Sequence, residues 1–538
     1  MDSIYSRIIV KMLPKVLSQV DRDKNSKTYG CCDRNHWHLK TRDFSSAILQ
    51  QIGLALAEVY LYDFEGNIFY HNEQVKEWAI ATVYYWEKIQ LKDGSFNEYY
   101  PNEHGFPPTA FSLLSACEVY KKLGMNDIKL EKAFEKTARY LASHLEKKAY
   151  NQEMASITAL YSYYQICKEE WVLNAVENKL KIFLSMQSEE GWFPEYGGAD
   201  IGYLSVCFDM LAEYYWLSKD ERVLEPLNRL TEFIQYFIHS DGTIGGEYAS
   251  RNTIYFLPNG PEVMSQLGNG IGASIKNHLY ADSDRNYFFL DSVDDRYCSH
   301  YVLNSFTRAL EKEILNTKEE HATLVKLPFQ SEFQKYFSHS GFYVYSQDGV
   351  YVIIGCRKGG VTKCFYGDKE VFCDYGYRIV GEKKGTGATS WQDDTYDIKV
   401  DGNKIVIEGN FNVVSQKVPS PILHMGLRVI SKVVGNKIIG FLKKQIILVD
   451  KHSEDNFCRQ IAIEAGVIRF EDILICQKES TIEEPDGFSL RHVASGKFFA
   501  TSDIVEHSRN RYCNRKQLKV CKEYDIKNQK WIVNEEQK

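Results

Sequence analysis

The chain has no excess of positive charge and no long apolar run. Its 65 Lys and Arg residues are outnumbered by 72 Asp and Glu residues, which gives a formal net charge of −7. Proteins that bind nucleic acid through its phosphates usually show the opposite balance, so we expect no nucleic-acid partner. No segment reaches the roughly 18 consecutive apolar residues of a membrane-spanning helix, so we expect no membrane span.

The N-terminal segment lacks the features of an export signal. Lys11, Pro14 and Lys15 interrupt its apolar residues, and no small-residue cleavage site follows. We therefore expect a cytoplasmic protein.

Cysteine is present without a pairing pattern. There are 13 cysteines, an odd number, with no CxxC pair and no spacing that resembles a zinc knuckle. The adjacent Cys31 and Cys32 cannot form an ordinary unstrained disulfide, so we expect reduced thiols.

Walker A, GxGxxG, GxSxG and HExxH motifs are missing too, which argues against nucleotide-driven and common hydrolase chemistry. The sequence predicts no cofactor and no metal.

Aromatic residues, by contrast, are abundant. Tyr (36) and Phe (29) bring the aromatic content to 14% of 538 residues, and 44% of the chain is hydrophobic. This length predicts two to four domains with sizeable cores. The aromatic residues suit such cores and also clefts in which sugar rings stack on flat side chains.

The first 330 residues show the periodicity of amphipathic helices, with apolar residues at i, i+3, i+4 and i+7. The segments that carry this pattern are 45–60, 75–90, 110–123, 130–145, 154–167, 171–186, 203–217, 223–238 and 300–314. From residue 331 onward, short β-branched and aromatic runs alternate with turn residues, as in an antiparallel sandwich. These runs are 341–346, 350–355, 397–403, 405–410 and 437–442. The sequence thus predicts a helical catalytic domain at 1–330 and an antiparallel β-sandwich at 331–538.

A similar turn recurs in the helical half. It reads Asp93 to Tyr99, Glu190 to Tyr196 and Asp241 to Tyr248, each time with a Gly, a hydrophobic residue and a Glu-Tyr pair. The Gly suits the left-handed position that ends a helix. Repeats of about 50 residues are typical of stacked helix pairs, so we predict an incomplete α/α toroid. The loops after the Glu-Tyr pairs should gather on one face and form a cleft.

The first of these loops places three polar residues together. Asn102, Glu103 and His104 precede a helix that starts near Thr109. Backbone N–H groups and the dipole at a helix N-terminus favour a bound carboxylate. The alternative is structural: Asn102 and Glu103 cap the turn while His104 packs.

The second and third loops add a phenol and a cation. Tyr196 and three glycines lead to Tyr203 at the start of a helix, where its phenol would point into the cleft. A phenol has an ordinary pKa of about 10, so it would act as a base only near a cation. Arg251, with Asn252 beside it, could bind a substrate carboxylate in bidentate geometry, or Arg251 could pair with Glu247.

An earlier segment, 29–44, is rich in His, Arg and Trp. Trp37 is a candidate sugar platform, and Arg34 and His38 are candidate polar contacts on the same cleft. His36 and His38 form an HxH pair, which without further ligands is weak evidence for a metal. In the second half, His424 is expected alone on a strand, with a structural role.

The motifs 102–104, 191–196 and 202–203, together with the order of toroid and sandwich, resemble the heparinase II/III-like and alginate-lyase-like polysaccharide lyases. The resemblance covers nearly the whole chain. It implies Tyr203 and His104 as base and acid and Asn102 as the group that neutralises the substrate carboxylate, with Arg251 or Asn252 assisting. The zinc site of many members is doubtful here, because the comparable strands at 365–376 contain no His.

Three functions follow as hypotheses. The first is β-elimination at a uronic acid of an acidic oligo- or polysaccharide, where the C5 proton becomes removable once the carboxylate is neutralised. The second is C5 epimerisation or another step of glycan biosynthesis, which the missing export signal favours. The third is glycan binding without catalysis. The linkage, the oligomeric state and the choice between cleavage and epimerisation stay open.

Overall fold

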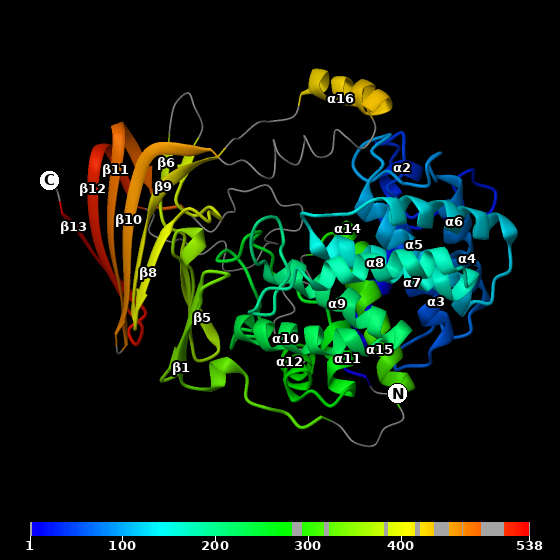
Figure 1. The fold of residues 1–538 in the computed structure, drawn as a ribbon, viewed down its shortest axis with the longest axis horizontal. Helices are drawn as coiled ribbons and strands as arrows, with labels where there is room; N and C mark the ends of the chain where they lie inside the picture. Colours follow the sequence, from blue (N-terminus) through cyan, green and yellow to red (C-terminus); the bar gives the residue numbers. More distant parts are fainter. Residues whose placement is uncertain are drawn as a thin grey trace.

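Helices come first in the chain and strands follow (Figure 1). The computed structural model describes residues 3–281, 293–316, 322–380, 386–414, 420–434, 451–464, 466–485 and 510–536. The helices are α1 (Ser6–Leu17), α2 (Arg34–Trp37), α3 (Ile52–Leu61), α4 (Glu73–Lys88), α5 (Phe106–Lys122), α6 (Ile128–Ser143), α7 (Tyr150–Cys167), α8 (Glu170–Leu184), α9 (Ile201–Ser218), α10 (Leu224–Ile234), α11 (Asn259–Gln266), α12 (Gly270–Tyr280), α14 (Asp295–Tyr297), α15 (Leu303–Leu315) and α16 (Pro421–Val434).

The helical half is built as an inner and an outer layer. Helices α3, α5, α7, α9, α11 and α15 contact one another in that order, and α15 also contacts α3. Helices α4, α6, α8, α10 and α12 pack outside them. An inner helix such as α9 is buried from Ile201 to Tyr214, as expected of a helix that is apolar on every side. Because an outer helix returns the chain each time, the inner helices begin on the same face.

Glycines lie in the turns that lead the chain from the outer helices back to the inner helices. Gly94, Gly191 and Gly242 have φ angles of +91°, +104° and +84°, the left-handed conformation that the repeated turn predicts. A Cβ on Gly94 would lie 2.3 Å from the carbonyl oxygen of Lys136, and one on Gly191 would lie 2.2 Å from that of Arg229. The turns at Gly94 and Gly191 therefore pack directly on the backbone of the next outer helix.

The strands form two sheets in which every pairing is antiparallel. Strands β1 to β5 follow one another in a five-stranded sheet, and β6 to β13 form an eight-stranded sheet. Their bounds are β1 (Phe333–Phe337), β2 (Phe342–Gln347), β3 (Val350–Gly355), β4 (Val361–Tyr366), β5 (Lys369–Asp374), β6 (Arg378–Val380), β7 (Thr386–Ala388), β8 (Asp397–Asp401), β9 (Lys404–Val414), β10 (His452–Glu464), β11 (Val467–Glu483), β12 (Arg511–Asp525) and β13 (Lys530–Glu536).

The five-stranded sheet is the middle layer of the molecule. In β3, Tyr351 and Ile353 belong to the large core of the toroid, whereas Val352 and Ile354 belong to the core between the two sheets. Both faces of this strand are buried, which explains its uninterrupted apolar sequence. The toroid and the sandwich therefore share a continuous interface through one sheet.

The structure confirms the predicted fold class, an α/α toroid followed by an antiparallel sandwich. Each of the nine predicted helices and the first four predicted strands corresponds to an observed element. The predicted strand at 437–442 lies outside the described residues. The placement of His424 was wrong, because this residue lies in α16, a helix that the sequence pattern did not reveal.

Two further findings concern cysteines and membranes. No disulfide bond links the thirteen cysteines, all of which lie in the described residues. No helix in the described part of the chain has the length and apolar character needed to cross a bilayer.

Candidate functional site

The candidate residues lie in the segments that precede the inner helices. The first loop leads into α5, the second into α9 and the third into α11, and these helices begin on the same face of the ring. A face that gathers helix N-termini favours an anionic ligand.

Asp200 joins the second and third loops. It caps α9 by accepting a hydrogen bond from the Tyr203 N–H at 3.1 Å, and it accepts another from the Arg251 N–H at 2.8 Å. The Thr253 hydroxyl also donates to its carboxylate. One buried carboxylate thus fixes Tyr203 and the backbone of Arg251 relative to each other.

Tyr203, Tyr196 and Arg251 lie together. The rings of Tyr196 and Tyr203 are 6.4 Å apart, and the Arg251 guanidinium lies 4.7 Å from the centre of the Tyr196 ring. The Gln152 amide donates to the Tyr196 hydroxyl at 3.2 Å. Arg251 is buried, with 3% exposure, yet its Nε and Nη1 atoms have no hydrogen-bond partner among the described residues. A buried guanidinium with unused donors is suited to bind a carboxylate.

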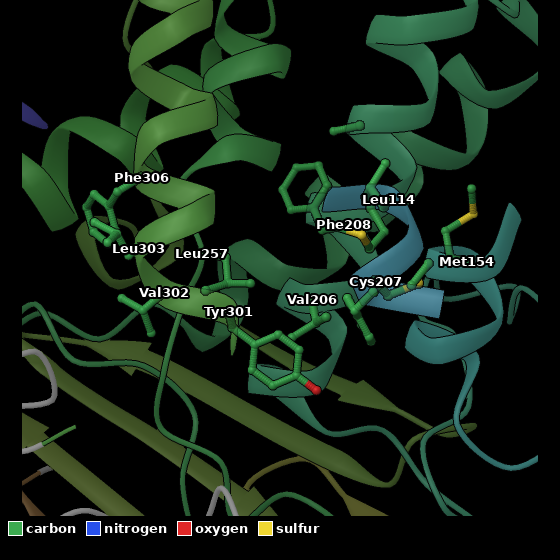
Figure 2. Packing of buried hydrophobic residues seen from close by; sticks show 14 of the residues in the cluster. Leu114, Met154, Val206, Cys207, Phe208, Leu257, Tyr301, Val302, Leu303 and Phe306 are labelled. Atoms are coloured by element: carbon green, nitrogen blue, oxygen red, sulfur yellow. The ribbon is translucent and has the colours of Figure 1, made fainter. Parts of the chain in front are cut away.

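Further tyrosines surround the other side of Tyr203. Its ring contacts Tyr255 edge-to-face at 6.2 Å, and Tyr255 stacks on Tyr301 at 6.0 Å. Burial raises the pKa of both Tyr297 and Tyr301 well above 10, and the nearby Tyr203 adds to each rise. Tyr301 lies in a π-helical turn, Cys298–Val302, a conformation frequent at functional sites. Figure 2 shows Tyr301 among the buried hydrophobic residues of the toroid core.

A histidine that the sequence analysis did not single out lies in this turn. The His300 ring stacks on Tyr301 with a centroid distance of 3.5 Å and meets Phe111 edge-to-face. Its Nε2 atom is buried without a hydrogen-bond partner among the residues described. Burial, and to a smaller degree Arg296, holds the pKa of His300 well below 6.5, so the imidazole is neutral at pH 7.

The first loop is held by its own side chains. His104 Nδ1 lies 2.6 Å from Asp93 Oδ2 and 2.8 Å from Ser95 Oγ. The Glu103 carboxylate accepts the backbone N–H groups of Glu98 and Tyr99, both at 2.7 Å. These contacts match the structural alternative for Glu103, and burial raises the pKa of its carboxyl.

Asn102 is half-buried in the same loop and has a φ angle of +58°. The loop reaches the tyrosine cluster through Tyr99, whose ring lies 4.4 Å from the Arg296 guanidinium. Burial raises the pKa of the Tyr99 phenol well above 10, and Glu98 and, to a smaller degree, Tyr203 add to the rise. No described contact joins His104 to Tyr203, so the catalytic roles of His104 and Asn102 stay predictions.

Glu247 and Asn252 face the sandwich. Glu247 forms an ion pair with Lys363 of β4 at 3.6 Å. The Asn252 side-chain oxygen accepts a hydrogen bond from Lys358 at 2.8 Å, and Lys358 also donates to the carbonyl oxygens of Ala249 and Ser250. The third loop therefore takes its shape from two lysines of the second domain. The binding of substrate by Glu247 and Asn252 stays a prediction.

The early segment borders α14. The Trp37 indole donates to the Gln19 carbonyl oxygen at 2.7 Å, and the Gln19 side chain donates to Asp295 at 2.8 Å. His38 is exposed and Arg34 is half-buried. This places the segment next to the helix that carries Arg296. In the described residues, no three His, Cys, Asp or Glu side chains are grouped as a metal site would require.

Sequence reasoning missed several residues of this face, among them Asn151, Gln152, Tyr255 and His300. The Asn151 amide donates to the Glu195 carboxylate at 2.7 Å. The start of α7 carries a signal that could have been used, because Asn151, Gln152 and Glu153 are three polar residues at the start of an apolar helix. His300 gave no such signal, since it fits the apolar pattern of its helix.

Comparison with known proteins supports the fold. No protein-family model matches this chain, and no curated protein matches it significantly. Solved structures do match. A Paenibacillus xanthan lyase aligns with 89% of this chain and 46% of its own, at a TM-score of 0.53 and 12% identity. A Streptomyces coelicolor chondroitin AC lyase aligns with 89% of this chain and 68% of its own, at a TM-score of 0.51 and 10% identity. Heparinase III aligns with 98% of this chain and 86% of its own, at a TM-score of 0.44 and 10% identity.

The likenesses to the xanthan and chondroitin AC lyases confirm that the chain has the fold of polysaccharide lyases, as the sequence resemblance implied. At 10–12% identity they concern the fold alone. The chain also spans less than half the length of the xanthan lyase chain.

Proposed function

We propose that this protein is a carbohydrate-active enzyme that removes the C5 proton of a uronic acid in an acidic glycan and cleaves the chain by β-elimination. The observation that carries the proposal is the buried Arg251 guanidinium, which has unused donors and stacks on Tyr196 beside Tyr203. The likeness of the fold to xanthan and chondroitin AC lyases supports it.

In the proposed reaction, Arg251 binds the C5 carboxylate and stabilises the charge that develops on it as the proton leaves. The Tyr203 phenolate takes the C5 proton. The electron pair of the broken C5–H bond forms a C4–C5 double bond, the C4–O4 bond breaks, and O4 leaves with the proton that Tyr203 has taken up. The neutral imidazole of His300, whose ring contacts lead to Tyr203 through Tyr301 and Tyr255, is the candidate acceptor of the phenol proton when the phenolate forms.

The test is an absorbance assay for the unsaturated uronate product with a panel of uronate-containing polysaccharides. We expect product from the wild-type chain and a loss of at least about 10²-fold in kcat for Tyr203→Phe, because positioned proton transfer is worth about that much. Arg251→Gln should raise KM and lower kcat together. Tyr70→Phe, at an exposed tyrosine, is the matched control and should keep full activity.

Two other results would contradict cleavage. Exchange of the C5 hydrogen with deuterated water, without unsaturated product, would identify an epimerase. Binding of oligosaccharide in calorimetry, unchanged in Tyr203→Phe and with neither reaction, would identify a glycan-binding protein.

A further inference from the structure

Helix α16 lies apart from the sheets that precede and follow it in the chain. Figure 1 shows it at the top edge of the molecule, near α2 of the toroid. Arg428 forms a bidentate ion pair with Asp43, at 2.7 and 3.0 Å, and the Ser431 hydroxyl donates to the Pro101 carbonyl oxygen at 3.1 Å. The helix is thus attached to two toroid segments that carry candidate site residues.

Most of the apolar side chains of α16 are exposed, unlike those of an ordinary surface helix. Ser431 is buried and Leu427 is half-buried against the protein, whereas Arg428, although paired with Asp43, is 49% exposed. Five apolar side chains are exposed, by 81% (Ile422), 65% (Leu423), 68% (Met425), 67% (Val429) and 47% (Ile430). A helix of a globular protein normally turns such a stripe toward its core. Five large apolar side chains on fourteen residues form a patch that calls for an apolar partner.

Apart from Asp43, which pairs with Arg428, the charges that accompany this patch along the sequence are positive. Helix α16 contains Arg428 and Lys432 and no acidic residue, although the whole chain has a net charge of −7. In the sequence from 416 to 449, no Asp or Glu occurs, and the basic residues are Lys417, Arg428, Lys432, Lys437, Lys443 and Lys444. An amphipathic helix with an apolar stripe and basic flanks is suited to the surface of an anionic bilayer.

We propose that α16 binds the surface of an anionic lipid bilayer, with Ile422, Met425 and Val429 inserted at the boundary between headgroups and acyl chains. At about 1.5 Å per residue, fourteen residues are too short to cross a hydrocarbon core of about 30 Å. The contact is therefore peripheral. It would hold the first loop, through Pro101, close to the membrane. If the proposed function is correct, the glycan substrate is one presented at a membrane surface.

Co-sedimentation of the full chain with lipid vesicles tests this inference independently of catalysis. We expect binding to vesicles of phosphatidylcholine with about 30% phosphatidylglycerol, and much weaker binding to phosphatidylcholine alone, because the basic residues contribute. The triple variant Ile422→Ser, Met425→Ser, Val429→Ser should bind at least about tenfold less. These side chains are exposed, so the fold should be retained, as circular dichroism can verify.

The matched control carries Ile68→Ser, Ile128→Ser and Ile182→Ser, three exposed residues of the toroid, and should bind vesicles like the wild type. Equal vesicle binding by the wild type and the α16 triple variant would overturn the proposal. The absence of wild-type binding to both kinds of vesicle would also overturn it. A dimer that the α16 variant abolishes, without any vesicle binding, would assign the patch to a second copy of the chain.

Discussion

Two histidines of the candidate face have different surroundings. His104 is hydrogen-bonded to Asp93 and Ser95 within its own loop. His300 is buried among aromatic rings, and its low pKa keeps it neutral. A neutral imidazole has a free lone pair and can accept a proton near pH 7, but it carries no acidic proton to donate. His300 therefore suits the role of a proton acceptor, and the contacts of His104 suit the positioning of the first loop.

This difference predicts unequal effects on catalysis. We expect His300→Gln to lower kcat by about 10²–10⁴-fold, because a positioned proton transfer is lost. We expect His104→Gln to change kcat by less than about tenfold and to act mainly on KM. Both are measured by the absorbance assay over a range of substrate concentrations, which gives kcat and KM. The opposite order of the two effects would restore His104 to the catalytic role implied by the family resemblance.

Local and distant interactions differ in how far the sequence reveals them. Tyr203 and Arg251 were predictable as neighbours of one site, because each follows a repeated turn that ends at the same face. The ion pair of Glu247 with Lys363 and the hydrogen bond of Asn252 with Lys358 were not, because each joins residues more than 100 positions apart. His300 was hidden by its fit to the helical pattern.

At the scale of elements, the glycine turns fix the spacing of the helical layers. Gly30, with φ +85°, repeats the arrangement of Gly94 and Gly191, since a Cβ there would lie 2.1 Å from the Ala81 carbonyl oxygen. The repeated turn could be predicted from the sequence because it depends on local backbone conformation. Helix α16 could not be predicted, because its Val and Ile residues are equally typical of strands.

A pair of glycine substitutions separates backbone strain from steric contact. Gly191→Ala and Gly268→Ala both place a side chain at positive φ, but only Gly191 has backbone within van der Waals reach. We expect Gly268→Ala to reduce the free energy of unfolding by about 1 kcal/mol and Gly191→Ala to reduce it by at least about 2 kcal/mol more. Urea denaturation of the full chain measures both. Equal losses would show that the turn adjusts without cost.

At the scale of the whole molecule, Lys358 links the two domains. Its ammonium group is buried and donates to three oxygens of the third loop. Lys358→Met should therefore leave those acceptors without their donor, which costs about 1–3 kcal/mol for each buried group that water does not reach. We expect a lower free energy of unfolding and reduced activity. Lys369→Met, at an exposed lysine in the same sheet, is the control and should change neither.

The position of Lys358 also bears on how the chain can be divided. A fragment that ends before β1 would keep Arg251 and Tyr203 but would lose the cation beneath Ala249, Ser250 and Asn252, and Glu247 would lose Lys363. The toroid alone thus lacks the ammonium group that shapes the loop carrying Arg251. An engineered version of the toroid alone needs another ammonium group in place of that of Lys358.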